Sequence, residues 1–288
     1  EISSMSSSLT ELKINVETFY DCLYFLDGRL GSLTKLIINV KKLPFEHIPS
    51  YINCQKELPK LKYFSLTMNN DADIYEIHII RLLRRMVNLE TLTLFLFLIQ
   101  IDLDYVDGIQ LHNDILIYLP RLKKFTFSIH TGVIMKRIKI HLSSNEDIQN
   151  SFIGRGYGQV GSYVCTLPLK TMNYCKGHCH IYSLPYQFKH FFGLNNSYHF
   201  QDGIFDKVRR LTMNDIESPF EHQFFILVSH YFPIVEELTI YNHISQQDKK
   251  NSSTLIIFPH LIFLNLAESP RDDILFVFIQ ELWLGNAF

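Results

Sequence analysis

The chain has 288 residues, of which 47% are apolar and 19% charged, and its formal net charge is −2. This composition is globular, and the near-neutral charge provides no basic surface for phosphate backbones, so we expect no nucleic-acid partner. The longest apolar run, Leu94 to Ile99, is too short to cross a bilayer, and the first residues do not resemble a signal peptide. We therefore expect an intracellular protein, cytoplasmic or nuclear, with no membrane partner.

A short apolar triplet, Leu-x-x-Leu-x-Leu or a close variant, recurs along the chain. Its first positions are separated by 24, 28, 28, 33, 86, 27 and 26 residues, and the long gap is about three periods. The copies begin at Leu9, Leu33, Leu61, Leu89, Leu122, Val208, Val235 and Leu261. Units of this length are typical of leucine-rich repeats, in which a single unit cannot bury its apolar face alone. We predict an α/β fold: a curved, right-handed leucine-rich-repeat solenoid with a parallel sheet on its concave face.

The elements of one unit can be followed at the first copy. Leu12, Ile14 and Val16 alternate with polar residues, which predicts a strand with one buried face. Helical spacing of apolar residues then predicts a helix over 17–30. Because strands and helices alternate, we expect parallel strands with right-handed crossovers. They should start near Leu12, Leu36, Phe64, Leu92, Phe125, Leu211, Leu238 and Leu264.

Further helices are expected between the later strands. One ends near Met86, and a second covers Val106 to Leu119 and stops before Pro120. A third opens at Ser218-Pro219, a favoured pair for a first helical turn, and runs to Pro233.

The triplet is lost between His130 and Phe205. A glycine cluster within this stretch, Gly154 to Gly161, predicts turns, and two strand-like pieces remain at Arg137 to Leu142 and His178 to Leu184. We interpret the stretch as an irregular insert around 130–205. One domain is therefore expected over 1–288, with regular repeats at 9–130, degenerate repeats and loop excursions at 131–204, and regular repeats at 205–288.

Motifs for catalysis or cofactor binding are weak. Gly156-x-Gly158-x-x-Gly161 matches a dinucleotide fingerprint, but no apolar strand immediately precedes it and no clear helix follows it, which favours a surface loop. Cys179 and His180 lie near further cysteine and histidine residues, yet adjacent strand residues point to opposite faces, which argues against zinc. No nucleophile or acid–base constellation is present. We expect no enzyme activity, no metal and no cofactor.

The strand residues that do not point inward are the better candidates for function. These residues lie between the triplet positions, so equivalent ones on successive strands should line up in rows across an exposed face of the sheet. In these rows small polar groups alternate with aromatic rings. Such a surface suits a protein partner better than a small molecule, although threonine and asparagine could equally be there because they tolerate crowded strands. The candidate binding residues are Thr93, Phe95, Thr126, Ser128, Thr212, Asn214, Thr239 and Tyr241.

Several strand phrases, among them Pro59-Lys60-Leu61 and Pro120-Arg121-Leu122-Lys123, resemble the repeat region of F-box/leucine-rich-repeat proteins. A later block from Cys179 to His222 is similar to a divergent invertebrate branch of that family. The asparagine that often closes the strand motif is replaced at most units, and no F-box precedes Leu9.

The resemblance implies that the repeats recruit a protein substrate for a ubiquitin ligase. An F-box upstream of Glu1, absent from this chain, would bind the ligase adaptor. We thus predict a non-catalytic protein–protein interaction scaffold that acts as such a substrate receptor. The alternative is a structural or regulatory repeat protein unrelated to ubiquitin.

Overall fold

The computed structural model of the chain describes residues 8–19, 21, 23, 26, 30–41, 57–68, 78–136, 140–166, 175–200, 202–215, 218–241 and 256–267. The chain divides into two compact units. Unit 1 comprises Glu1–Thr166 and Tyr174–Ser183, and unit 2 comprises Leu167–Asn173 and Leu184–Phe288. Each unit is described on its own below, and the single domain expected from the sequence stays a prediction.

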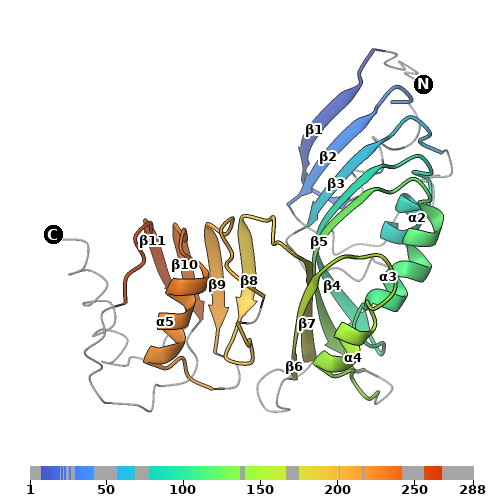
Figure 1. The fold of residues 1–288 in the computed structure, drawn as a ribbon. Coiled ribbons are helices and arrows are strands. Elements are labelled where there is room, and N and C mark those ends of the chain that lie inside the picture. Colours follow the sequence, from blue (N-terminus) through green and yellow to red (C-terminus); the bar gives the residue numbers. More distant parts are fainter. Residues whose placement is uncertain are drawn as a thin grey trace. The chain divides into compact units, whose positions relative to one another are not determined.

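Unit 1 contains a seven-stranded sheet in the order β1-β2-β3-β4-β5-β7-β6 (Figure 1). Strands β1 to β5 pair in parallel, whereas β7 is antiparallel to both β5 and β6. The mixed α/β class is therefore confirmed. The strands are β1 (Glu11–Val16), β2 (Lys35–Val40), β3 (Tyr63–Met68), β4 (Thr91–Ile101), β5 (Lys124–Ile134), β6 (Val160–Thr166) and β7 (Cys175–Ser183).

The triplet residues set the register of the parallel strands. Leu36 pairs with Leu12 on one side and Phe64 on the other, and the same row continues to Leu92 and Phe125. Leu36, Phe64 and Leu92 are fully buried. The predicted strand starts and their parallel pairing are thus confirmed in unit 1, because each triplet supplies side chains to one continuous core.

The described helices of unit 1 lie on the core side of this sheet. They are α2 (Ile80–Leu83), α3 (Gly108–Asp114) and α4 (Asn145–Asn150), with a 3-10 turn, η2 (Leu116–Tyr118), after α3. Figure 1 shows α2, α3 and α4 on the same side of the sheet. Leu83, Leu111 and Ile115 join the buried cluster that the strands form.

A backbone turn recurs immediately before the strands. The N–H of the first triplet residue donates to the carbonyl three residues earlier, as in Leu61 to Leu58 (3.1 Å), Leu89 to Met86 (2.9 Å) and Leu122 to Leu119 (3.0 Å). At the strand start two successive N–H groups then donate to one carbonyl of the preceding unit. Lys62 and Tyr63 both donate to Thr34 in this way. The sequence repeat is therefore also a repeat of backbone geometry.

Unit 2 contains a four-stranded parallel sheet in the order β11-β10-β9-β8. The same turn precedes β9 and β11, where Val208 donates to Phe205 (3.2 Å) and Leu261 to Phe258 (3.2 Å). Row partners Leu211, Leu238 and Leu264 confirm the predicted parallel strands. The elements are β8 (His190–Leu194), β9 (Arg210–Asn214), α5 (His222–Tyr231), β10 (Glu237–Tyr241) and β11 (Phe263–Ala267).

Two helix predictions need correction. The helix expected to open at Ser218-Pro219 begins at His222, after Glu221 as N-cap. The helix expected over 106–119 is interrupted: Asp107 caps α3 by accepting from Gln110 N at 2.7 Å, and the chain tightens into η2 after Ile115. The helix predicted over 17–30 falls partly outside the described residues. Among the described helices none could cross a membrane, since the longest, α5, has 10 residues and a span needs about 20.

In the stretch 131–204 the strand predicted at His178 to Leu184 is confirmed as part of β7, but its antiparallel pairing differs from the parallel strands of the regular repeats. β7 pairs antiparallel with β5 and β6 pairs antiparallel with β7, which extends the sheet, and β8 is parallel to β9. The antiparallel strands still alternate between faces, so that Cys179 and Ile181 join the core. Of the strand predicted at 137–142, residues 137–139 lie outside the described residues and 140–142 are not a strand.

Candidate binding face

The side of the unit 1 sheet opposite the triplet residues is the face on which the sequence placed a binding site. Because side chains alternate along a strand, it is formed by the residues between the buried ones. We call the first three such rows on β1 to β5 the outward face. They are Glu11, Lys35, Tyr63, Thr91 and Lys124; then Lys13, Ile37, Ser65, Thr93 and Thr126; then Asn15, Asn39, Thr67, Phe95 and Ser128.

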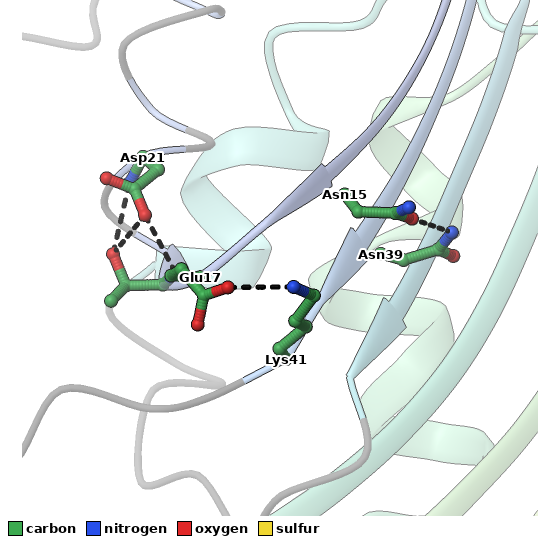
Figure 2. A network of polar contacts seen from close by, with 6 residues as sticks. Asn15, Glu17, Asp21, Asn39 and Lys41 are labelled. Carbon is green, nitrogen blue, oxygen red and sulfur yellow. Dashed lines mark hydrogen bonds and ion pairs between the residues drawn. The ribbon is translucent and has the colours of Figure 1, made fainter.

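Polar side chains on β1 and β2 form a ladder across this face. Asn39 Nδ2 donates to Asn15 Oδ1 at 2.8 Å, because the in-register parallel pairing places the two amides side by side (Figure 2). Just beyond the strands, Lys41 Nζ contacts Glu17 Oε1 at 2.8 Å in the same manner. Both contacts are exposed, so at this end the face offers hydrated hydrogen-bonding groups.

Farther along the same side of the sheet, rings from β4, β5, β7 and β6 pack on one another. Phe97 stacks on His130 with centroids 4.5 Å apart, and His130 stacks on His180 at 3.6 Å. Tyr163 and Tyr182 approach the His180 ring at 5.7 and 4.6 Å. We call these five residues the ring cluster; it continues the outward face but is buried or nearly so.

His180 is the centre of the ring cluster. Its Nε2 lies 2.9 Å from Ser128 Oγ, and its side chain is 1% exposed. Burial, with a smaller contribution from His130, lowers the pKa of His180 well below its ordinary value. The imidazole is therefore uncharged near neutral pH, which suits packing between rings.

Four predicted site residues lie on the unit 1 face. The structure brings them together in two rows, in which Thr93 pairs with Thr126 and Phe95 with Ser128. Thr93 is partly exposed, but Phe95, Thr126 and Ser128 are only 3%, 7% and 0% exposed. For these three residues the predicted exposure is wrong: Phe95 packs on Phe97 with ring centroids 5.8 Å apart, and Ser128 Oγ lies 2.9 Å from Nε2 of the buried His180 ring. Their role in binding stays a prediction.

The other four predicted residues lie in unit 2. Thr212 pairs with Thr239 and Asn214 with Tyr241. All are partly exposed except Thr212, which is 7% exposed and whose Oγ1 is 3.1 Å from His190 Nε2. Burial, and secondarily Arg210, lowers the pKa of His190 to about 4. Thr212 is thus covered by a neutral imidazole near neutral pH, and its predicted exposure is also wrong.

Within the cysteine–histidine segment, Cys179 and His180 do not come together as ligands. Cys179 points into the core and His180 to the opposite face, as the strand geometry predicted. Burial, with smaller effects of Asp104 and Asp107, raises the pKa of the Cys179 thiol. Among the residues that the structure describes, no group of three histidine, cysteine or acidic side chains could hold a metal.

The first two glycines of the glycine motif, Gly156 and Gly158, lie in a loop together with Gly154, whereas Gly161 lies in β6. Gly154, Gly156 and Gly158 have φ values of 73°, 77° and 76°, and a Cβ placed on any of them would meet nothing within 4 Å. The strand β6, and not a helix, begins at Val160. These glycines therefore serve turns with positive φ, as predicted for a surface loop.

Sequence reasoning did not single out the ring cluster. A signal for it exists, because the apolar run Leu94 to Ile99 continues past the triplet, and an apolar run without alternation indicates a strand buried on both faces. The 11-residue lengths of β4 and β5 show the consequence. Those strands extend beyond the repeat motif, and their second halves carry Phe97 and His130.

Comparison of the chain with protein-family models, with curated proteins and with solved structures finds no match.

Proposed function

We propose that this chain is a non-catalytic protein–protein interaction scaffold, built as a leucine-rich-repeat solenoid and binding its partner through the outward face. The observation that carries the proposal is the in-register face itself: short polar side chains repeat from strand to strand while the described helices of unit 1 lie on the opposite side. The recurring turn before the strands supports the repeat architecture.

The dimensions of the face favour a macromolecular partner. Neighbouring strands are about 4.8 Å apart, so β1 to β5 span about 19 Å, more than a small molecule needs. Tyr63 and Ile37 add partly exposed apolar area among hydroxyl and amide groups. An aromatic and aliphatic centre with a polar surround is typical of protein interfaces.

The narrower reading is that the repeats recruit a substrate for an F-box-type ubiquitin ligase. It rests on the sequence resemblance alone, and adaptor binding would require an F-box upstream of Glu1. The alternative is a structural or regulatory repeat protein without a link to ubiquitin. Adaptor capture by a longer product of the gene would favour the first, and an upstream region without an F-box would favour the second.

The proposed face is tested by affinity capture from cells followed by mass spectrometry. Thr67→Arg and Thr93→Arg place charged bulk on the outward face, while Ile117→Arg places it on η2, where Ile117 is 54% exposed. We expect both face variants to lose a partner that the wild-type and Ile117→Arg chains retain. Loss of that partner only in Ile117→Arg would place the interface elsewhere.

A further inference from the structure

The charges on the outward face of unit 1 are unbalanced. Its three rows carry Lys13, Lys35 and Lys124 against one carboxylate, Glu11, in a chain whose formal net charge is −2. Glu11 Oε2 lies 3.1 Å from Lys35 Nζ, so Glu11 offsets Lys35, whose side chain is still 41% exposed and can contact a second carboxylate. Within the described residues neither Lys13 nor Lys124 has an ion-pair partner, and both are exposed.

Charged residues at the starts and ends of the strands do not offset the excess of positive charge on the outward face. At the strand starts, Lys62 and Lys123 flank Glu90, at 3.2 and 2.6 Å. Hydrogen bonds from these two lysines, first from Lys123, lower the pKa of Glu90, so its charge is held between theirs. At the strand ends Glu17 and Lys41 neutralise each other. Unit 2 differs, since the corresponding row of its sheet places Arg210 opposite Glu237.

We propose, as a deepening of the proposed function, that the outward face binds an extended acidic segment of a protein partner, with Lys13, Lys35 and Lys124 contacting its carboxylates. A protein segment fits better than a nucleic acid because the lysines are few and are separated by hydroxyl, amide and aromatic side chains suited to a peptide. The aromatic ring of Tyr63, over which Lys35 lies at 5.7 Å, offers an apolar contact beside the charge.

The strand positions of the lysines also predict the spacing of the acidic residues. Lys124 lies on β5, three strands from Lys35 on β2 and four from Lys13 on β1. With about 4.8 Å between strands and about 3.3 Å per extended residue, these separations of about 14 and 19 Å correspond to about four and six residues. The expected segment therefore carries acidic side chains at i, i+4 and i+6, all on one side of an extended chain.

The test is a fluorescence-anisotropy titration of the full chain with labelled nine-residue peptides. One peptide places glutamates at i, i+4 and i+6 in a neutral serine and threonine host, a second has the same glutamates at i, i+1 and i+2, and a third replaces them by glutamine. We expect the first peptide to bind at least ~tenfold more tightly than the others, with affinity falling as salt rises.

Variants then identify the residues. Lys13→Ser and Lys124→Ser should each weaken the first peptide several-fold, and together about tenfold. Lys136→Ser removes one positive charge, as each single variant does, but just beyond the far end of β5, and should change the affinity less than about twofold. Lys124→Glu should weaken the first peptide and recover binding to one in which the glutamate facing Lys124 is lysine.

Several outcomes would overturn the inference: equal binding of the first two peptides, tighter binding of a single-stranded oligonucleotide of matched charge, or no binding of any acidic peptide at low salt. The proposed scaffold function and the proposed acidic partner can be distinguished by experiment. If capture from cells depends on Thr67 and Thr93 but not on Lys13 and Lys124, the scaffold reading stands and the acidic partner is wrong.

Discussion

The parallel strands β1 to β5 and the antiparallel strands β7 and β6 belong to one sheet but present different outward sides. At the parallel end, Asn15, Asn39 and Thr67 leave hydrogen-bonding groups partly or fully exposed. At the antiparallel end, the rings of His180 and Tyr182 are 1% and 0% exposed. One sheet therefore provides a hydrated surface at one end and a packed ring cluster at the other.

The two ends differ in the size of their outward side chains, and not in which strand residues point into the core. Reversal of strand direction leaves the alternation intact, so Cys179 and Ile181 of β7 enter the same buried cluster as Leu92 and Leu94 of β4. The core thus continues across the change from parallel to antiparallel pairing. The side chains on the outward side do not contribute to this core, so their size and polarity can change from one end of the sheet to the other.

Leu92→Ala tests the parallel end. Leu92 is fully buried, so its truncation should lower the free energy of unfolding by ~2–5 kcal/mol in urea titrations. In the proposed repeat array contacts are local, so hydrogen exchange should accelerate most in β3 and β5, the neighbours of β4, and least in β1. Equal acceleration in β1 and β3 would contradict the array model.

Ile181→Ala is the matched change at the antiparallel end. Ile181 is also fully buried and pairs with Ile129 and Ser162. We expect a loss of similar size, ~2–5 kcal/mol, with faster exchange in β5 and β6. A loss below about 1 kcal/mol would instead mean that β6 and β7 pack only loosely on the core.

Gly108→Ala tests how closely α3 is packed. A Cβ at Gly108 would lie 2.6 Å from the Ser151 carbonyl oxygen and 2.8 Å from the Phe152 ring. Alanine is the better helix former, yet this overlap should make the substitution cost ~1–3 kcal/mol in thermal or urea unfolding. Asn113→Ala, at an exposed position of the same helix, is the control and should be neutral or stabilising. A stabilised Gly108→Ala protein would show that the contact is absent.

The sequence predicted the parts of the fold that repeat. Leu36, Phe64 and Leu92 recur at regular spacing within similar apolar patterns, which predicted parallel strands with these residues in one row. The antiparallel pairing of β7 could not be predicted, because Ile181 and Tyr182 show alternation but carry no information about direction. The predicted exposure of Ser128 was also wrong, since it depends on the rings of His180 and Tyr182, which are distant in sequence.

Acid should weaken the fold through the ring cluster. Burial lowers the folded-state pKa of His180 below its unfolded value of 6.5, so the unfolded chain binds the extra proton. Stability is then fully present above pH 6.5 and falls on acidification, by up to ~1.4 kcal/mol per pH unit. His190, with a pKa of about 4, acts in the same direction. Urea titrations from pH 7.5 to 5 should show a shallower decline for His180→Gln, and equal slopes would contradict this assignment.

The amide ladder should have the smallest effect. Asn39→Ala removes one exposed hydrogen bond to Asn15 and should cost only ~0.5–1 kcal/mol. A double-mutant cycle with Asn15→Ala, measured by urea unfolding, isolates the coupling between the two side chains. No coupling at all would mean that the ladder does not form in solution.

The central claim, that the outward face of the parallel strands holds the partner, is tested most directly by site-specific photocrosslinking in cells. A photoreactive side chain is placed at Thr67 or Thr93 on the face, or at Ile117 on η2 as the matched position on the helix side. The account predicts the same crosslinked partner from Thr67 and Thr93 and none from Ile117. Crosslinks from Ile117 without any from the two face positions would contradict it.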